Sequence, residues 1–263
     1  MPVINLKPDN LNEKNREFAQ RDLRKPVFLN SVPKCGTHLI RNIVRMFVPV
    51  EQQYDEVFIQ HVTLKNHLKA FDLPNPRVSW GHLLFSADAA IALQQVNHIL
   101  LIRDPYDWVP ARARFFLSEQ FLGNLDEIKG GAITAEEVLN MMIMGVHAKA
   151  PSLLSVFMFN AVSWYGTRAR FVRYEDLIKN LKGLDGPEAE AFFVSLLSDC
   201  GIDPIPEDWR ERVRIGSDRR QSSTARENLT LPTSVEIPSV LPPAQKALVD
   251  YAAPGLRKLL GYE

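Results

Sequence analysis

The segment VFLNSVPKCGTHLIRNIVRMF, residues 27–47, constrains the fold of this chain more than any other stretch. Val27–Val32 is apolar and has the length of a strand, Pro33 and Gly36 interrupt it, and apolar residues return from Leu39 at helical spacing. A strand, a tight turn and a helix in this order bring backbone N–H groups and the positive end of a helix dipole to one point. The segment therefore predicts a P-loop-like turn that binds an anion such as phosphate or sulfate.

Further apolar runs of strand length follow this segment, and helical patterns separate most of them. The runs are Arg77–Leu84, Val96–Arg103 and Arg170–Tyr174, and the helical patterns are Leu39–Val48, Ala135–Met144, Pro187–Leu197 and Pro243–Leu260. This alternation predicts a single α/β domain over residues 26–263, with a central, mostly parallel sheet flanked by helices. Residues 1–25 are predicted to be a polar N-terminal lead-in, and residues 207–238 to be a long loop.

The charge balance and the cysteine count limit the kinds of partner and location. Lys+Arg and Asp+Glu both total 31, so no global positive field indicates a nucleic-acid or membrane partner. No stretch approaches the roughly 20 apolar residues that span a bilayer, and the N-terminus lacks an apolar signal core. Cys35 and Cys200 give neither a disulfide framework nor a metal-ligand cluster. We therefore expect no metal, a reducing compartment and a cytoplasmic location.

The turn itself allows more than one chemistry. Lys34 adds a mobile positive charge, Gly36 lets the backbone approach a ligand closely, and Thr37 offers a helix cap and a hydroxyl. The GxxxxGK[ST] pattern of nucleotide triphosphatases is absent. Cys35 and Arg41 have the C-x5-R spacing of cysteine phosphatases, in which a thiolate at a helix N-terminus is the nucleophile. That interpretation is disfavoured because the residues between them already follow the apolar stripe of the helix.

The octet PKCGTHLI, residues 33–40, resembles the 5′-phosphosulfate loop of the sulfotransferases that use 3′-phosphoadenosine 5′-phosphosulfate (PAPS), usually PKSGTTWL. Cys35 stands in place of the serine and His38 in place of the second threonine. The resemblance implies that Lys34, Cys35, Gly36, Thr37 and His38 bind the 5′-phosphate and sulfate oxygens of PAPS. It also implies that Lys34 stabilises the leaving group.

HILLIRDPYDWVPARARFF, residues 98–116, resembles the second motif of this family, a buried strand that ends in R-[ND]-P-x-D before a helix. The resemblance implies that Arg103 binds the 3′-phosphate, a task for which a guanidinium fork is suited. The alternative is that Arg103 pairs with a neighbouring aspartate. The family also places a phosphate-binding serine eight residues after this arginine. Here that residue is Ala111, so another group, such as Arg112 or Arg114, must supply the contact.

RVSWGHLLFS, residues 77–86, lies between these two motifs and resembles the family segment that carries the catalytic base. The resemblance implies that His82 takes the proton of the acceptor, and an imidazole is suited to this because its ordinary pKa lies near neutrality. Some members of the family carry a second catalytic lysine two residues earlier. Here that residue is Trp80, to which we assign no such role. The remaining histidines are expected to be ordinary core or surface residues.

RFVRYEDLIKN, residues 170–180, resembles the family element F-x-Y-E-D, which implies that Tyr174 packs near the adenine of PAPS. The two acidic residues that follow, Glu175 and Asp176, are expected in the first turn of the next helix, where carboxylates are favourable.

The basic stretch RVRIGSDRRQSSTARENL, residues 212–229, is loosely similar to the late loop with which the family closes its nucleotide site. The similarity makes Arg219, Arg220 and Arg226 candidates to reach the 3′-phosphate. A solvated run of charges is the alternative.

These resemblances predict an enzyme that moves a sulfuryl group from PAPS to a hydroxyl or amine of a small acceptor, with His82 as general base. A non-catalytic PAPS-binding protein of the same fold is the alternative. Many apolar and aromatic side chains occur within residues 115–165. They either line a pocket for a hydrophobic acceptor or form core, and helical spacing favours core. Steroid, phenol, sugar, lipid and natural-product acceptors all remain open, and so does the oligomeric state.

Overall fold

The computed structural model of the chain describes residues 3–5, 8–54, 58–123, 125–222, 224–231 and 235–263. Contacts between residues divide the chain into two compact units. The sheet unit comprises Asp9–Ile102 and Phe159–Gln221. The helical unit comprises Met1–Pro8, Arg103–Met158 and Ser222–Glu263.

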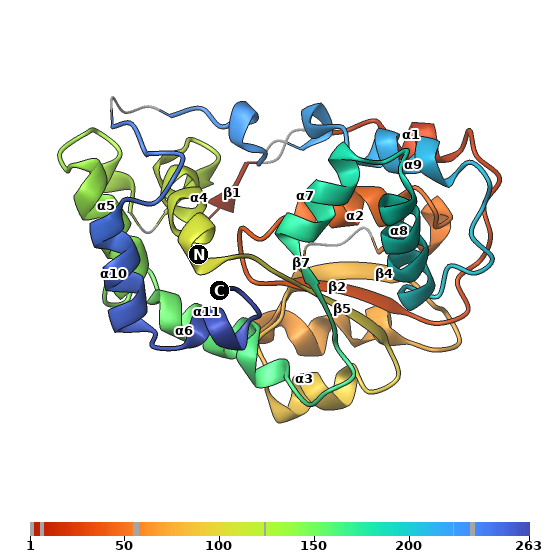
Figure 1. The fold of residues 1–263 in the computed structure, drawn as a ribbon. Coiled ribbons are helices and arrows are strands. Elements are labelled where there is room, and N and C mark those ends of the chain that lie inside the picture. The colour runs from red at the N-terminus through yellow and green to blue at the C-terminus, as the bar shows by residue number, and fades with distance from the viewer. Residues whose placement is uncertain (1–2, 6–7, 55–57, 124, 223, 232–234) are drawn as a thin grey trace. The chain divides into compact units, whose positions relative to one another are not determined.

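A five-stranded sheet forms the centre of the sheet unit, and all of its neighbouring strands are parallel (Figure 1). Its strands, in spatial order, are β3 (Ile59–Gln60), β4 (Val78–His82), β2 (Val27–Ser31), β5 (Asn97–Ile102) and β7 (Arg170–Arg173). Every residue of β2 is buried, which fits a parallel strand covered on both faces. The predicted α/β fold with a mostly parallel sheet is therefore confirmed.

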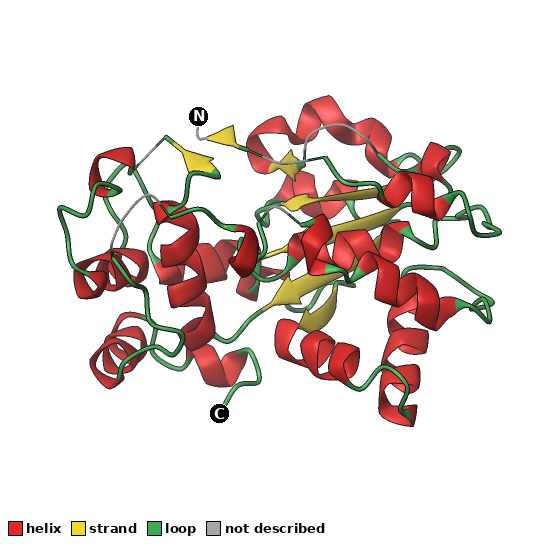
Figure 2. Ribbon diagram, turned by 90° about the horizontal axis from the view of Figure 1, so that it is seen from above, coloured by secondary structure: helices red, strands yellow, loops and turns green. Residues whose placement is uncertain are grey.

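Helices cover both faces of this sheet. In Figure 1, α2, α7 and α8 lie over one face and α3 over the other, and Figure 2 shows the helices above the strands. The helices of the sheet unit are α1 (Leu11–Asn15), α2 (Thr37–Arg45), α3 (Ala87–Ala92), α7 (Tyr174–Lys182), α8 (Pro187–Asp199) and α9 (Trp209–Gly216), with the 3₁₀ segments η1 (Val50–Gln52), η2 (His61–Phe71), η4 (Val162–Trp164) and η5 (Arg219–Gln221). Glu175 and Asp176 lie in the first turn of α7, as predicted.

The helical unit contains α4 (Pro105–Leu117), α5 (Ala135–Met144), α10 (Pro243–Ala252), α11 (Leu256–Leu259), η3 (Asp126–Ile128) and η6 (Arg226–Asn228). Helices α4, α5 and α10 pack against one another. Two short strands, β1 (Val3–Ile4) and β6 (Phe121–Leu122), pair antiparallel. The boundary between the two units falls within α6 (Leu153–Asn160).

Two predictions about the C-terminal part of the chain are wrong. Residues 207–238 are not one long loop, since they include α9 and two 3₁₀ segments. The sequence pattern did not predict α9 because a charged residue, Arg212, occupies its apolar stripe beside Trp209. Arg212 is buried and donates to the carbonyl oxygens of Ala19 and Met46. The predicted helix Pro243–Leu260 is two helices, α10 and α11, separated where Gly255 has a φ of 72°.

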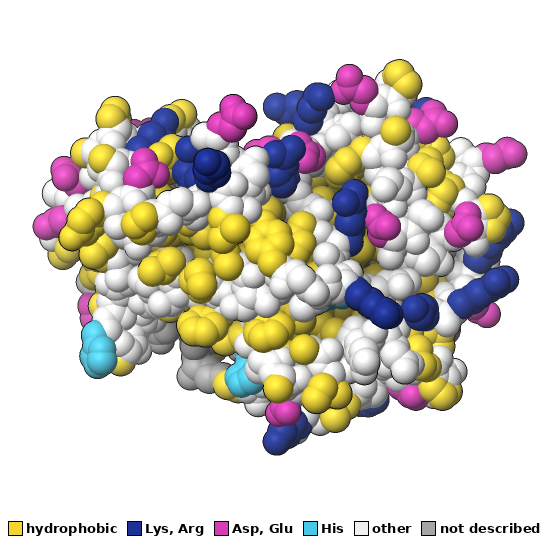
Figure 3. Space-filling model, turned by 60° about the horizontal axis from the view of Figure 1, so that its bottom comes forward, with side chains coloured by type: hydrophobic (Ala, Val, Ile, Leu, Met, Phe, Trp, Pro, Cys, Tyr) yellow, Lys and Arg dark blue, Asp and Glu magenta, His cyan; other side chains and the backbone are white. Residues whose placement is uncertain are grey.

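The N-terminal residues 9–25 belong to the sheet unit and include α1, where Leu11 is fully buried. On the face shown in Figure 3, basic and acidic side chains are interspersed, and neither sign forms a continuous field. Among the described residues, no helix combines the length and apolarity needed to cross a membrane. The same residues contain no group of three or more His, Cys, Asp or Glu side chains arranged to hold a metal ion.

Candidate functional site

The predicted anion-binding turn lies at the carboxyl end of β2, between the last strand residue, Ser31, and the first residue of α2, Thr37. Gly36, the N-cap of α2, has a φ of 100°, and Lys34 has a φ of 69°, a value that few non-glycine residues adopt. The N–H of Cys35 donates to the carbonyl oxygen of Val32 over 3.1 Å and closes the turn. A strained lysine in a turn at a helix N-terminus is a feature of functional loops that bind anions.

The ring of Tyr174 lies directly against this turn. A Cβ atom added to Gly36 would be 2.6 Å from Cδ2 of Tyr174, so only glycine fits between the ring and the start of α2. Tyr174 is the first residue of α7, directly after β7. The structure thus brings Tyr174 to the same edge of the sheet as the loop, where the resemblance placed it.

His82 is the last residue of β4, the strand beside β2, so its ring reaches the same edge. Its Nδ1 lies 3.1 Å from the carbonyl oxygen of Ser31 and 3.1 Å from the hydroxyl of Ser31. A carbonyl oxygen can only accept, so this bond requires the proton on Nδ1 and leaves the lone pair on Nε2. The Ser31 hydroxyl in turn lies 2.5 Å from the hydroxyl of Thr37.

Asn30 fixes the chain directly after His82. This buried side chain donates to the carbonyl oxygen of Leu83 over 3.1 Å and accepts from the N–H of Leu83 over 2.9 Å. The two bonds join the end of β2 to both the N–H and the carbonyl oxygen of Leu83, the residue directly after β4. They therefore hold His82 beside the loop independently of its own ring contacts.

The two imidazoles of this edge are kept neutral. The pKa of His82 is lowered to about 4, chiefly by burial and also by the Lys34 ammonium, while the bond to the Ser31 carbonyl opposes both. Burial also lowers the pKa of His38 to about 3, with contributions from the charges of Arg41, Lys34 and His82. At neutral pH His82 is therefore a free base with an available Nε2.

Trp80, two residues before His82, contacts three other side chains near this edge. Its ring lies 5.1 Å from the ring of His38 and 5.5 Å from that of Phe58, and the guanidinium of Arg41 stacks over it at 4.6 Å. Cys35 is 0 % exposed. The two residues of the C-x5-R spacing are thus a buried thiol and a guanidinium held by an indole, an arrangement that does not favour the cysteine phosphatase interpretation.

In the helical unit, three arginines gather near the start of α4. Arg103 follows β5 directly in the chain, Arg114 lies in α4, and Arg226 lies in η6. The pKa of Arg114 is lowered to about 10, chiefly by burial and also by the charges of Arg226 and Arg103, while Asp107 opposes them. Arg114 also donates to the carbonyl oxygen of Pro238 over 3.0 Å. Arg114 thus lies close enough to feel the charges of both Arg103 and Arg226, and guanidinium groups near one another are suited to a dianionic phosphate.

The neighbours of this cluster have structural contacts. Asp104 accepts from the N–H of Tyr106 as the N-cap of α4 and pairs with Arg257 at 2.8 Å. Arg112 is buried, donates to the carbonyl oxygen of Met142 over 3.0 Å and stacks on Trp108. Of the two arginines predicted to replace the lost serine contact, Arg114 is therefore the one beside Arg103.

Arg219 and Arg220 lie in η5 of the sheet unit, and both are exposed. The side chain of Arg220 is 88 % exposed and pairs with Asp218 at 2.8 Å. This contact matches the solvated-charge alternative for Arg220. Arg226, by contrast, lies in the cluster with Arg114.

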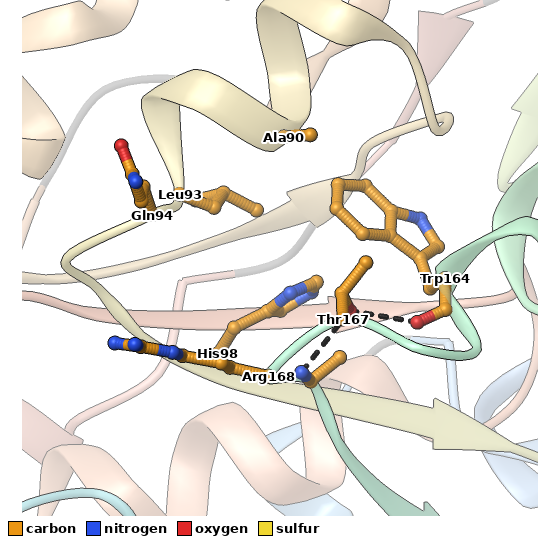
Figure 4. A pocket seen from close by; sticks show the side chains of 8 residues that line it. Ala90, Leu93, Gln94, His98, Trp164, Thr167 and Arg168 are labelled. Atoms are coloured by element: carbon orange, nitrogen blue, oxygen red, sulfur yellow. Dashed lines mark hydrogen bonds between the residues drawn. The ribbon is translucent and has the colours of Figure 1, made fainter.

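A second feature of the sheet unit is a cavity at the amino end of β5. Its volume is about 200 Å³, and Figure 4 shows Ala90 of α3 and Leu93, directly after this helix, on one side and His98 of β5 on the other. His98 pairs with Phe28 in the sheet, three residues before Ser31, so the cavity lies at the end of the sheet opposite to the loop. It shares no residue with the site around His82.

Two residues of this edge, Asn30 and Ser31, are not among the site residues that the sequence predicts. Both lie in an otherwise apolar strand directly before the turn. Two adjacent polar residues at the carboxyl end of a buried strand were the available signal, because such groups must find hydrogen-bond partners.

Comparison with solved structures identifies the fold. A crystal structure of mouse sulfotransferase SULT7A1 complexed with PAP matches with a TM-score of 0.55 and 18 % identity over 97 % of this chain and 94 % of that chain. Retinol dehydratase in complex with androsterone and inactive cofactor PAP matches with a TM-score of 0.46 and 14 % identity over 83 % of this chain and 68 % of that chain. No family model and no curated protein sequence matches. The chain has the fold of the cytosolic-type sulfotransferases.

Proposed function

We propose that this protein is a sulfotransferase that moves a sulfuryl group from PAPS to a hydroxyl or amine of a small acceptor. The observation that carries the proposal is the position of His82, a neutral imidazole held through Nδ1 beside a loop that bears Lys34. A base next to an anion-binding loop is the arrangement that sulfuryl transfer requires, because the attacking hydroxyl must lose a proton as negative charge develops on the leaving oxygen.

Each residue at the loop has a different role in the proposed transfer. His82 accepts the proton of the acceptor at Nε2 while its Nδ1–H continues to donate to the carbonyl oxygen of Ser31. Lys34 neutralises the charge that develops on the oxygen between sulfur and the 5′-phosphate. Thr37, His38 and the amides of Cys35 to Thr37 hold the oxygens of the phosphosulfate.

The arginines of the helical unit recognise the other end of the nucleotide. Arg103 and Arg226 bind the 3′-phosphate, and Arg114 supplies the contact that Ala111 cannot make. Tyr174 packs near the adenine, and the exposed Arg219 adds positive charge to the surface that the nucleotide approaches, whereas the charge of Arg220 is balanced by Asp218.

The acceptor and the cellular location are also part of this proposal. A small, hydrophobic alcohol or phenol fits an edge where Phe58 lies 5.4 Å from the ring of His82. Of the aromatic residues in 115–165, Phe115, Phe157 and Trp164 are buried core residues, whereas Phe159 is exposed. Cys35 and Cys200 are free thiols, which fits the cytoplasm.

The test has two steps. The protein is first titrated with adenosine 3′,5′-bisphosphate, and the shift of its melting temperature is measured. Transfer of labelled sulfate from PAPS is then followed with a panel of phenols, steroids, sugars and amines. Stabilisation followed by transfer to any acceptor supports the proposal. Binding without transfer to any acceptor supports the non-catalytic alternative, and no binding overturns both.

A further inference from the structure

Ser31 connects the general base to the residue that begins α2. Its hydroxyl lies 3.1 Å from Nδ1 of His82 on one side and 2.5 Å from the hydroxyl of Thr37 on the other. Ser31 is fully buried and Thr37 is nearly so. Three side chains from β4, β2 and α2 thus form one continuous chain of hydrogen-bonding groups.

The direction of this chain follows from its first member. Nδ1 of His82 carries a proton because it faces the carbonyl oxygen of Ser31 at 3.1 Å. The hydroxyl of Ser31 also faces this proton, so its oxygen accepts and its own proton points to Thr37. The oxygen of Thr37 then accepts, and its proton is directed away from Ser31. Thr37 is thereby an obligatory donor at the N-terminus of α2, where an acceptor oxygen of an anion is favoured.

We propose that Ser31 is a positioning residue that relays hydrogen-bond direction between an anion bound at Thr37 and the imidazole of His82. The inference rests on the proposed function for the identity of the anion, and on the geometry alone for the coupling. An anion that accepts from Thr37 fixes both hydroxyl protons and strengthens the contact of Ser31 with Nδ1. When Nε2 takes the proton of the acceptor, the positive charge on the ring is shared along the same chain. The contact that orients the base is therefore strongest when the sulfate donor is in place.

The coupling is measured on the full chain with ¹⁵N-labelled histidine. Adenosine 3′,5′-bisphosphate is added, and the Nδ1 signal of His82 is followed by NMR in the wild type, Ser31→Ala and Ser79→Ala. Ser79 is a matched control, since it is a buried serine of the same sheet that donates to Val27 instead. We expect a shift of the His82 signal in the wild type and in Ser79→Ala, and a response less than about half as large in Ser31→Ala. The signals of His98, at the other end of the sheet, report correct folding of each variant.

Kinetics supply the second readout. Ser31→Ala is expected to lower kcat about tenfold with a change in the KM for PAPS below about threefold, because the lost group acts through the base. Ser31→Cys keeps a weak donor of similar size and is expected to lie between the wild type and Ser31→Ala. The effects of Ser31→Ala and Thr37→Val on kcat are expected to be non-additive, because both interrupt the same chain.

The failures of the two proposals are distinguishable. A Ser31→Ala variant that behaves like Ser79→Ala in both readouts overturns the relay, whether or not the wild type transfers sulfate. An absent His82 response in the wild type, or fully multiplicative effects in the double variant, also overturns it. A wild type that shows the NMR response and transfers no sulfate supports the relay and contradicts the enzymatic proposal.

Discussion

The two ends of the central sheet each hold a histidine whose pKa is far below its ordinary value, and the two histidines differ in their surroundings. His82, at the carboxyl end, has Nδ1 fixed by Ser31 and lies within the field of Lys34. His98, at the amino end, contacts the rings of Phe28 and Trp164, and its Nε2 has no hydrogen-bond partner among the described residues. Burial lowers the pKa of both, to about 4 and about 3.

This difference shows that a displaced pKa alone does not mark a functional residue. Burial in an apolar environment disfavours the imidazolium wherever it occurs. His82 differs from His98 in its directional contacts. Its Nδ1–H donates to the Ser31 carbonyl oxygen, its Nε2 keeps a lone pair, and Lys34 and the N-terminus of α2 lie nearby. Matched substitutions at the two ends of the sheet test whether these directional contacts, and not burial, give His82 its role.

The largest difference is expected when each histidine is replaced. His82→Ala should reduce turnover about 10³-fold, because a positioned base contributes 10²- to 10⁴-fold, and should leave the affinity for adenosine 3′,5′-bisphosphate within about threefold. His98→Phe should leave turnover within about threefold. Sulfate transfer and titration calorimetry measure the two effects. Normal turnover in His82→Ala removes this residue from the role of base.

The next difference concerns the cations at the two ends. Lys34→Ala should reduce turnover about 10²-fold and weaken nucleotide binding about tenfold, since the ammonium acts on the bound anion and more strongly on the leaving oxygen. Arg168→Ala removes an exposed cation beside the cavity at the other end and should change neither quantity. Equal effects of the two substitutions would show that Lys34 acts only through the overall charge.

A smaller effect is expected for Arg103, which directly follows the carboxyl end of β5. Arg103→Ala should weaken binding of adenosine 3′,5′-bisphosphate about 10- to 100-fold, because a charge-assisted contact to a phosphate is lost. Binding of adenosine 5′-phosphosulfate, which lacks the 3′-phosphate, should change by less than about twofold. Arg170→Ala, which removes an exposed partner of Asp199, is the control. Unchanged bisphosphate affinity in Arg103→Ala contradicts the assigned position of the 3′-phosphate.

The smallest effect concerns stability and pH. The unfolded chain protonates His98 near its ordinary pKa, whereas the folded chain does so only near pH 3, so the free energy of unfolding decreases as pH falls below about 6.5. Between pH 6.5 and 5.0 this residue should account for about 2 kcal/mol. Urea titrations should give a shallower pH dependence for His98→Phe than for the wild type. Identical slopes would show that His98 is protonated in the folded protein.

The fold and the main elements of the site were predictable because they depend on short-range patterns. Buried strand-length runs predicted β2, β4, β5 and β7, and Pro33 and Gly36 predicted the turn. The resemblance to the sulfotransferase family implied that His82 acts beside the sulfate bound at the loop, and the carboxyl ends of parallel strands do meet at one edge. The structure brings the two together, and the catalytic roles remain predictions.

The remaining features depend on contacts between distant segments, which a sequence pattern does not contain. The sequence did not reveal α9 because the buried Arg212, besides pairing with Asp208, donates to carbonyl groups about 170 to 190 residues away in the chain. Nothing in SWGHLL indicates that Trp80 receives Arg41, or that Asn30 holds the amide after His82. The partners of buried polar groups are determined only when the strands are placed side by side.

The close contact between Tyr174 and Gly36 has a consequence for how the loop can respond to a ligand. The ring of Tyr174 fills the space on one side of the turn at Gly36, which restricts how the turn can rearrange when an anion binds. The loop is therefore ordered when the protein folds, so binding an anion costs less conformational entropy. Even a single methyl group at position 36 would separate α7 from the loop, and the protein would lose this preorganised geometry before it lost its fold.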